Sequence, residues 1–291
     1  MQGDLFAVIA PVLITAAIGY AWSKSGRAFD TEFITTIVLT IATPCLVFSS
    51  LTRLPVAVET MAQVAVAYLV VLVLLGVGGA VFLRLVGWPA HSYLPAIMFG
   101  NLGNMGIPLA MFAYGEAGLA LAVAGFAIHS VGQFTVGVSV ASGSMSVRQL
   151  SRTPVVYGVI AALPLVVFEV RPPLWISNAA QLLGSMVVPL MLLTLGVALA
   201  RLKVQRLGRS VVIAFVRLGG GLAAGFAAAS LLGLEGTARG VLIIQAAMPL
   251  AVFNYVFAQR YKREPEDVAA AIIISTIVSF STLPFLLLLI R

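Results

Sequence analysis

Charged residues are scarce in this sequence: Asp, Glu, Lys and Arg together account for 9% of its 291 residues, whereas hydrophobic residues account for 61%. A soluble domain has about a quarter of its residues charged, because its surface needs them. This chain has too few charges to cover a surface in water, so most of its exterior must face lipid. The formal net charge of +7 does not indicate a nucleic-acid partner, since the location of charges in a membrane chain matters more than their sum.

Alternation of polar and apolar residues, which would indicate barrel strands, is also absent. Instead, apolar runs of about 17–25 residues recur at nearly constant spacing, which is the length that a helix needs to cross about 30 Å of hydrocarbon. The loops between them leave no room for a soluble domain. The sequence predicts an all-α membrane protein with ten transmembrane helices, at about 5–23, 33–51, 60–84, 92–112, 117–140, 153–169, 176–200, 210–232, 237–259 and 267–290.

Cysteine is almost absent, because Cys45 is the only one, and this excludes disulfides within the chain. The basic N-terminal region of a secretory signal is missing as well. Residues 1–5 carry Asp4 and no Lys or Arg, and no small-residue cleavage site clearly follows the first apolar run. We therefore expect the first run to be a retained helix.

Acidic residues are missing from the interior of the predicted spans, since all ten lie in loops or at span ends. An intramembrane enzyme would need paired Asp, a Ser with a base, or a His–Glu cluster for zinc, so we predict no enzyme, no metal site and no cofactor. His129 and Arg217 are the ionisable groups inside spans, and such groups are functional candidates by default.

His129 and Gln133 are four residues apart and share a helix face. One hypothesis is that His129 lines a cavity and binds substrate or carries a coupling proton; the other is a neutral histidine that donates to a nearby carbonyl. Arg217 lies about two turns from the basic cluster that ends at Arg209. A side chain that snorkels to the membrane surface explains Arg217 better than a role in substrate binding.

Basic residues alternate between loops. Twelve of the 17 Lys and Arg residues lie in the alternate loops 24–32, 84–91, 141–152, 201–209 and 260–266, whereas the opposite loops and the termini hold only Arg53, Arg171, Arg239 and Arg291. Basic residues in short loops mark the cytoplasmic side. This bias predicts a cell inner membrane protein with both termini on the non-cytoplasmic side, which agrees with an even number of crossings.

A short internal repeat relates the two halves of the chain. Residues 108–114 (PLAMFAY) and 249–255 (PLAVFNY) are identical at five of seven positions, and Pro44 and Pro189 give a weaker match. The two seven-residue segments fall in the fourth and ninth spans, which are offset by five spans, so the repeats have inverted topology. We predict two inverted five-helix repeats, residues 1–148 and 149–291, with the binding site where they meet.

The fourth and ninth spans contain poor helix formers. Residues 100–108 (GNLGNMGIP) hold three Gly, two Asn and one Pro, and residues 245–249 (QAAMP) are a milder version. Pro108 and Pro249 suit the first turn of half-helices, whose N-termini favour an anion. The candidate substrate-binding residues are Asn101, Asn104, Gly106, Pro108, His129, Gln133, Gln245, Pro249 and Asn254.

Ordinary proline kinks with small residues for close packing are the alternative explanation of these two spans. Thr40 and Thr43 in the second span and Ser185 in the seventh are candidates for a polar scaffold wall of the site. Such hydroxyls more often bond to the carbonyls of their own helix.

The segment from Gly100 to Pro108, the paired Pro249 and Asn254, and ten spans with short loops resemble the auxin efflux carrier family in its bacterial form. The resemblance implies a fold similar to that of the bile acid–sodium symporters, in which spans four and nine cross in a transport subdomain formed by spans three to five and eight to ten. Spans one, two, six and seven would form a scaffold, often at a homodimer interface. It also implies a small organic anion as substrate, a dicarboxylate or an auxin. Two features depart from the family: the long central loop of many plant members is missing, and the ninth span has Gln245 and Ala247 at its break.

These observations together predict a secondary transporter of a small organic anion that works by alternating access. An anion channel or a uniporter without ion coupling is the alternative, because channels also use broken helices.

Overall fold

The computed structural model describes residues 5–52, 57–143, 154–168, 170–202 and 207–290. Within these ranges the regular structure is helical, and seven helices are long and apolar enough to cross a membrane, with the shorter apolar helix Pro154–Val166 beside them. The protein is therefore an α-helical, multi-pass membrane protein, as the scarcity of charge predicts. Several residues that carry earlier inferences, namely Asp4, Arg53, Arg148, Arg152, Lys203, Arg206 and Arg291, and the predicted boundary between the repeats, lie outside the described residues.

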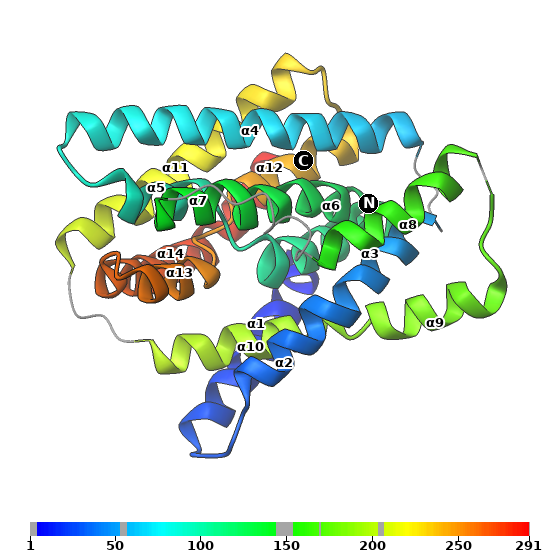
Figure 1. Ribbon diagram of the computed structural model, residues 1–291, viewed down its shortest axis with the longest axis horizontal. Coiled ribbons are helices and arrows are strands. Elements are labelled where there is room, and N and C mark those ends of the chain that lie inside the picture. Colours follow the sequence, from blue (N-terminus) through cyan, green and yellow to red (C-terminus); the bar gives the residue numbers. More distant parts are fainter. Residues whose placement is uncertain (1–4, 53–56, 144–153, 169, 203–206, 291) are drawn as a thin grey trace.

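The first half of the chain contains the elements α1 to α7 (Figure 1). The run Thr31–Thr52 is one continuous helix, because a π-helical turn joins α2 to α3. The bounds are α1 (Leu5–Lys24), α2 (Thr31–Ile37), a π-helical turn (Val38–Ala42), α3 (Thr43–Thr52), α4 (Val58–Leu85), α5 (Ala90–Met98), a π-helical turn (Leu102–Gly106), α6 (Ile107–Gly132), a π-helical turn (Gln133–Gly137) and α7 (Val138–Ser142).

The second half contains α8 to α14. A tight turn at Ser185 and Met186 connects α9 to α10, so that they continue one another. The bounds are α8 (Pro154–Val167), α9 (Leu174–Gly184), α10 (Val187–Arg201), α11 (Gly208–Leu231), α12 (Gly236–Ala246), α13 (Phe253–Tyr261) and α14 (Pro265–Leu289).

Gly115 divides the longest helical run. Residues Leu102–Ser142 form 41 residues of apolar helix, about twice the length that one crossing requires. Gly115 has φ 65° and ψ −151°, a backbone conformation that residues with a Cβ rarely adopt. The run therefore consists of two legs that meet at Gly115.

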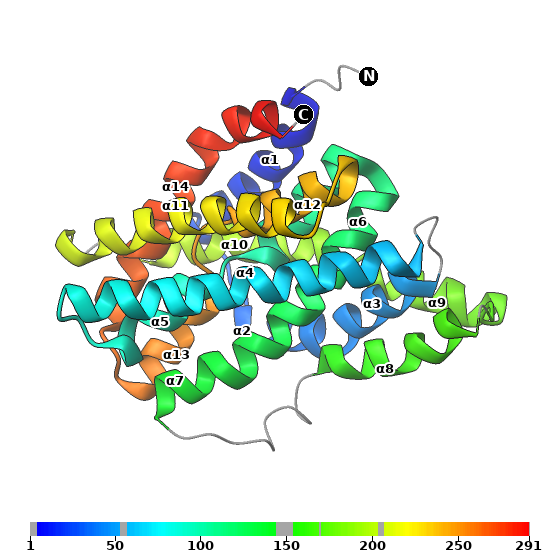
Figure 2. The ribbon, with the colours of Figure 1, turned by 90° about the horizontal axis from the view of Figure 1, so that it is seen from above.

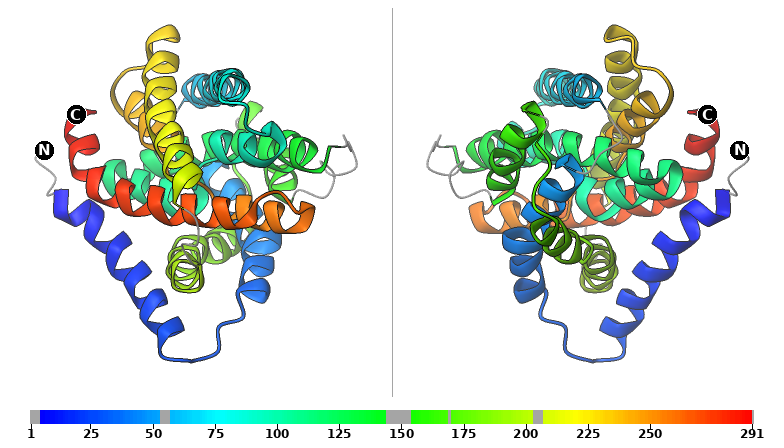
Figure 3. Two further views of the ribbon diagram at one scale, coloured as in Figure 1. Left: turned by 90° about the vertical axis from the view of Figure 1, so that its left-hand side faces the viewer. Right: turned by 90° about the vertical axis from the view of Figure 1, so that its right-hand side faces the viewer.

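Close helix contacts depend on small residues. α1 packs along α10, and a Cβ placed on Gly19 or on Gly196 would collide with the backbone of the other helix. Such small residues let membrane helices approach closely. α3 packs against α8 and α9, while α4 packs against α6 and α11 (Figure 2). Seen end-on, α1 and α2 diverge from the turn that joins them (Figure 3).

Large apolar side chains cover the outside of the described helices. Phe6, Trp175, Leu182, Leu231 and Phe285 are each more than 70% exposed. A soluble monomer rarely exposes extended apolar surface, whereas a lipid-facing one does. This surface agrees with the membrane assignment.

Candidate functional site

The first helix interruption lies at residues 99–101. α5 ends at Met98, Phe99 has extended backbone angles (φ −105°, ψ 107°), and Asn101 is also outside the helical region. A π-helical turn, Leu102–Gly106, then leads directly into α6. Pro108 lies in the first turn of α6, as predicted. The interruption lies at the beginning of the predicted segment 100–108 and not directly before Pro108, because Asn104 already belongs to the π-helical turn.

The second interruption separates α12, which ends at Ala246, from α13, which begins at Phe253. The prediction that Pro249 starts a half-helix is wrong, because Pro249 lies inside the non-helical link. The physical reason is pairing: Leu250 forms an isolated antiparallel bridge with Gly100. This bridge holds the link extended, so the helix resumes only after Val252.

The two interruptions bind each other directly. The Asn101 amide donates to the Pro249 carbonyl (2.7 Å), and the Ala251 amide donates to the Phe99 carbonyl (3.1 Å). The side-chain amide of Asn254 also donates to the Phe99 carbonyl (2.9 Å). Backbone groups freed inside a membrane must find partners within the protein. Several backbone amides that the helix interruptions would leave without partners are thus hydrogen-bonded between the two interruptions. We call these two paired links, residues 99–101 and 247–252, the crossover.

Arg217 of α11 forms hydrogen bonds to carbonyl groups at both interruptions. Its side chain is fully buried, so the interpretation as a snorkelling residue is wrong. Its Nε donates to the Met248 carbonyl, Nη1 to those of Ile97 and Met98, each at 3.1 Å, and Nη2 to that of Ala246 at 2.9 Å. These carbonyls lie where α5 and α12 end, and terminal carbonyls have no partner within their own helix.

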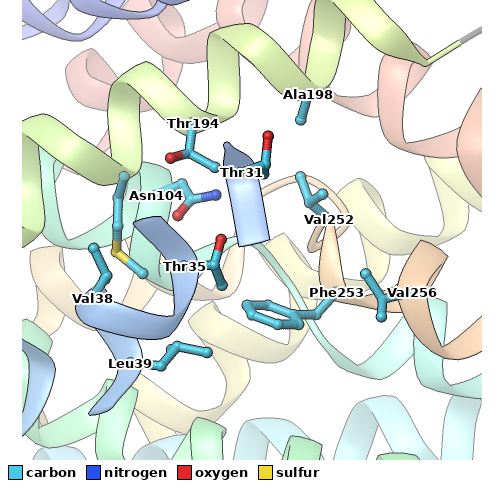
Figure 4. A pocket seen from close by; sticks show the side chains of 11 residues that line it. Thr31, Thr35, Val38, Leu39, Asn104, Thr194, Ala198, Val252, Phe253 and Val256 are labelled. Atoms are coloured by element: carbon cyan, nitrogen blue, oxygen red, sulfur yellow. The ribbon is translucent and has the colours of Figure 1, made fainter. Parts of the chain in front are cut away.

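A cavity of about 110 Å³ lies beside the crossover, and we call it the Asn104 cavity (Figure 4). α2 and α10 form one wall, and the helical segments that follow the two interruptions form the other. Its polar side chains are Asn104 and three threonines, and the remainder of the lining is apolar. The lining residues are Thr31, Thr35, Val38, Leu39, Asn104, Met191, Thr194, Ala198, Val252, Phe253 and Val256.

Arg201, at the C-terminal end of α10, lies at the rim of the Asn104 cavity. It is exposed, and it donates to the Thr31 hydroxyl (2.9 Å) and to the Phe29 carbonyl (2.8 Å). A second, more polar hollow of about 330 Å³ is lined by Arg201, Tyr255, Gln259 and Glu266, among others. Arg201 therefore lines the second hollow and binds Thr31, which lines the Asn104 cavity, so its positive charge lies close to both.

Among the predicted binding residues, Asn104 is the one that lines this cavity. Asn101, Pro249 and Asn254 form the crossover itself, and Gly106 lies next to Gln245 and Met248. The structure thus gathers these residues at the helix interruptions, mostly behind the cavity wall. Pro108 is buried in the first turn of α6.

The other predicted residues lie deeper. Gln245 is fully buried and donates to the Ala122 carbonyl (2.7 Å). His129 is buried among the rings of Tyr68, Phe99 and Phe126, and Gln133 is buried one turn further along. Within the described residues these groups leave several buried polar atoms without a hydrogen-bond partner, namely Tyr68 Oη, Asn101 Nδ2, His129 Nδ1, Gln133 Nε2, Gln245 Oε1 and Asn254 Oδ1.

The threonines of the cavity were missed by sequence reasoning. The hydroxyl groups of Thr40 and Ser185 are exposed and donate to the Thr36 and Leu182 carbonyls of their own helices, as the alternative interpretation predicts. Thr43 is buried outside the cavity lining. A usable signal was the pair of threonines at positions 31 and 35, which are four residues apart and share a helix face.

Interrupted helices that cross beside a cavity inside a lipid-facing helical protein are typical of a membrane transporter. Comparison with known families places the chain within this class: residues 138–287, more than half of the chain, match the family described as "Membrane transport protein". The chain belongs to this family, that of the auxin efflux carriers, and is a transporter rather than an enzyme.

Two curated relatives cover nearly the whole chain. An uncharacterized transporter of Methanocaldococcus jannaschii is 25% identical over 94% of both chains. A protein of Rhizobium meliloti named "Putative malonate transporter" is 26% identical over 100% of this chain and 97% of its own length.

Proposed function

We propose that this protein is a secondary transporter that carries a small organic anion across the cell inner membrane by alternating access, with the Asn104 cavity as its substrate site. The observation that carries the proposal is the position of this cavity. α2 and α10 bound it on one side and the crossover bounds it on the other, so relative movement of the two walls would expose it to either side of the membrane.

An anion fits the chemistry of this cavity. Asn104, near the start of the helical run that leads into α6, and Val252 and Phe253, at the start of α13, all line it. The first four amides of a helix lack intrahelical partners, and helix N-termini carry about half a positive charge. Both features favour a carboxylate. The name of the Rhizobium relative, a transporter of malonate, fits a small carboxylate of this kind.

The same proposal includes ten crossings in two inverted repeats, residues 1–148 and 149–291. The antiparallel pairing of Gly100 with Leu250 supports it, because the paired segments are the ones that the repeat relates. The contacts of α1 with α10 and of α3 with α8 and α9 support a scaffold built from both halves. The loop charges support a location of both termini on the non-cytoplasmic side.

Uptake of radiolabelled malate, malonate and an indole carboxylate into proteoliposomes tests the function, under imposed pH, sodium and voltage gradients. We expect saturable uptake of at least one anion. Asn104→Ala removes a hydrogen bond to a charged group, worth about 1.5–3 kcal/mol, so its KM should rise about 10- to 150-fold. Single-channel currents, or a KM that Asn104→Ala leaves unchanged, would contradict the proposal.

A further inference from the structure

Four backbone carbonyls converge behind the crossover. Ile97 and Met98 are at the end of α5, and Ala246 and Met248 are at the end of α12 and just beyond it. The final carbonyls of a helix are unpaired, and each helix C-terminus carries about half a negative charge. In transporters with interrupted helices, oxygens of this type coordinate coupling cations.

The Arg217 guanidinium occupies this carbonyl cluster. All three of its nitrogens donate to the cluster, at 2.9–3.1 Å, and the side chain is fully buried. The surroundings fit a planar cation closely. A Cβ on Gly100 would overlap the guanidinium, and a Cβ on Gly221, one turn along α11, would overlap the Ala246 carbonyl.

Charge balance is consistent with this arrangement. A charge inside a membrane protein is costly unless it is compensated. Two helix C-termini supply about one negative charge between them, which matches the single charge of a permanently protonated arginine. The titratable side chains beside the guanidinium, within the described part of the chain, are Tyr68 of α4 and His129 of α6, and neither is a carboxylate.

We propose that Arg217 is a tethered replacement for an exchangeable coupling cation, so that the crossover carries its positive charge permanently and binds no sodium during transport. Removal of the side chain should then create a site for a soluble monovalent cation, with guanidinium as the best fit. The part of this inference that concerns coupling rests on the proposed transport function. The part that concerns the cation site does not.

Thermal unfolding of the purified Arg217→Ala protein in detergent tests the cation site without any transport substrate. We expect millimolar guanidinium, against choline at equal ionic strength, to raise its Tm saturably, since a ligand that binds the folded state stabilises it. Wild type and Arg217→Met, in which a side chain fills the site, should show no such rise. Arg209→Ala removes an arginine from the exposed end of the same helix and is the matched control. Absence of a saturable rise with guanidinium, sodium and potassium alike would overturn the inference.

Flux measurements test the coupling. Wild-type flux should be equal in sodium and in choline media, and Arg217→Ala flux should be lost in choline and regained with guanidinium. Arg217→Lys keeps the charge and replaces the alanine variant in this test if that variant fails to fold. We expect Arg217→Lys to have a lower Tm than wild type and a flux that is still independent of sodium. Sodium-dependent flux of the wild type or of Arg217→Lys would overturn the inference. Lack of anion flux in every protein, together with a guanidinium-dependent Tm of Arg217→Ala, would refute the proposed function and leave the cation site supported.

Discussion

Two threonine hydroxyl groups of the continuous helix Thr31–Thr52 have different positions relative to the proposed substrate. Thr35 is half-buried and lines the Asn104 cavity, whereas Thr40 is exposed and donates to the Thr36 carbonyl. Two residues of the same type on one continuous helix therefore give a matched pair. Comparing them isolates the contribution that a cavity-facing hydroxyl makes to binding of the transported anion.

Thr35→Val keeps the side-chain shape and removes one hydrogen-bonding group. The loss of a single bond, about 0.5–1.5 kcal/mol, should raise the KM for the transported anion about 2- to 10-fold, while the amount of folded protein stays the same. Thr40→Val should leave KM unchanged in the same proteoliposome assay. Equal effects of the two substitutions would indicate that the hydroxyl of Thr35 does not contact the anion.

His129 provides a test of proton coupling at the residue scale. It lies behind the cavity wall, among aromatic rings, where Phe fits without a polar group. If His129 carries the coupling proton, His129→Phe should abolish the stimulation of uptake by a pH gradient and leave substrate exchange at equal pH intact. Stimulation of the same size in wild type and variant would remove this role.

At the scale of elements, the crossover was largely predictable from composition, because a cluster of Gly, Asn and Pro weakens a helix wherever it occurs. The exact ends were not predictable. Pro249 alone suggests a helix start, but its neighbour Leu250 pairs with Gly100, 150 positions away in sequence, and a single sequence does not reveal that pairing.

Arg217 is a clearer example of long-range contacts that a single sequence does not reveal. Its carbonyl partners lie 29–120 residues away along the chain, and α11 has apolar residues on most sides, so no periodic pattern indicates which face is buried. The sequence identified Arg217 as an ionisable group inside a span, but only the packing of α11 against α5 and α12 shows what it binds. The cavity threonines were missed for a similar reason, since their helix face is defined by its neighbours.

The contact between α1 and α10 leads to a prediction about stability. Gly196 lies against the Ala16 carbonyl, whereas Gly219 of α11 has no neighbour near its missing Cβ. Gly196→Ala should force the helices apart and cost about 1–3 kcal/mol, as overpacking does, which lowers the Tm in detergent. Gly219→Ala, a helix substitution with open space, should be neutral or slightly stabilising. A Tm for Gly196→Ala at or above that of Gly219→Ala would contradict the described packing.

At the scale of the whole molecule, the rim of the Asn104 cavity lies beside loops that the sequence assigns to one side of the membrane. Thr31 and Ala198 line it next to the α1–α2 turn and the end of α10, which belong to the basic loops proposed to be cytoplasmic. In Figure 1 the turn after α4, also one of these loops, is at the opposite end of the molecule from the turn between α8 and α9. The cavity should therefore open to the cytoplasm.

Cysteine labelling tests this orientation, because Cys45 is the only native cysteine. With Cys45 replaced by Ser, Thr194→Cys should react with a membrane-impermeant maleimide in inside-out vesicles and be protected in right-side-out ones. Glu235→Cys, in the turn between α11 and α12, should show the reverse. Identical sidedness of the two positions would refute the proposed topology. The homodimer that the family resemblance implies is tested separately, by the mass of the purified protein in detergent.

The hydrogen bonds between the two interruptions also restrict how the molecule moves. Residues 99–101 and 248–251 are joined by backbone bonds, and the Arg217 guanidinium ties both to α11. In the proposed transport cycle these segments would move as a single rigid body, because a hinge between them would leave backbone amides and carbonyls without hydrogen-bond partners inside the membrane. The lining of the Asn104 cavity is mostly apolar, so its two walls could slide past each other without breaking the hydrogen bonds of the crossover. The substrate would therefore bind at the surface of the moving crossover, in the interface between the two walls that slide past each other.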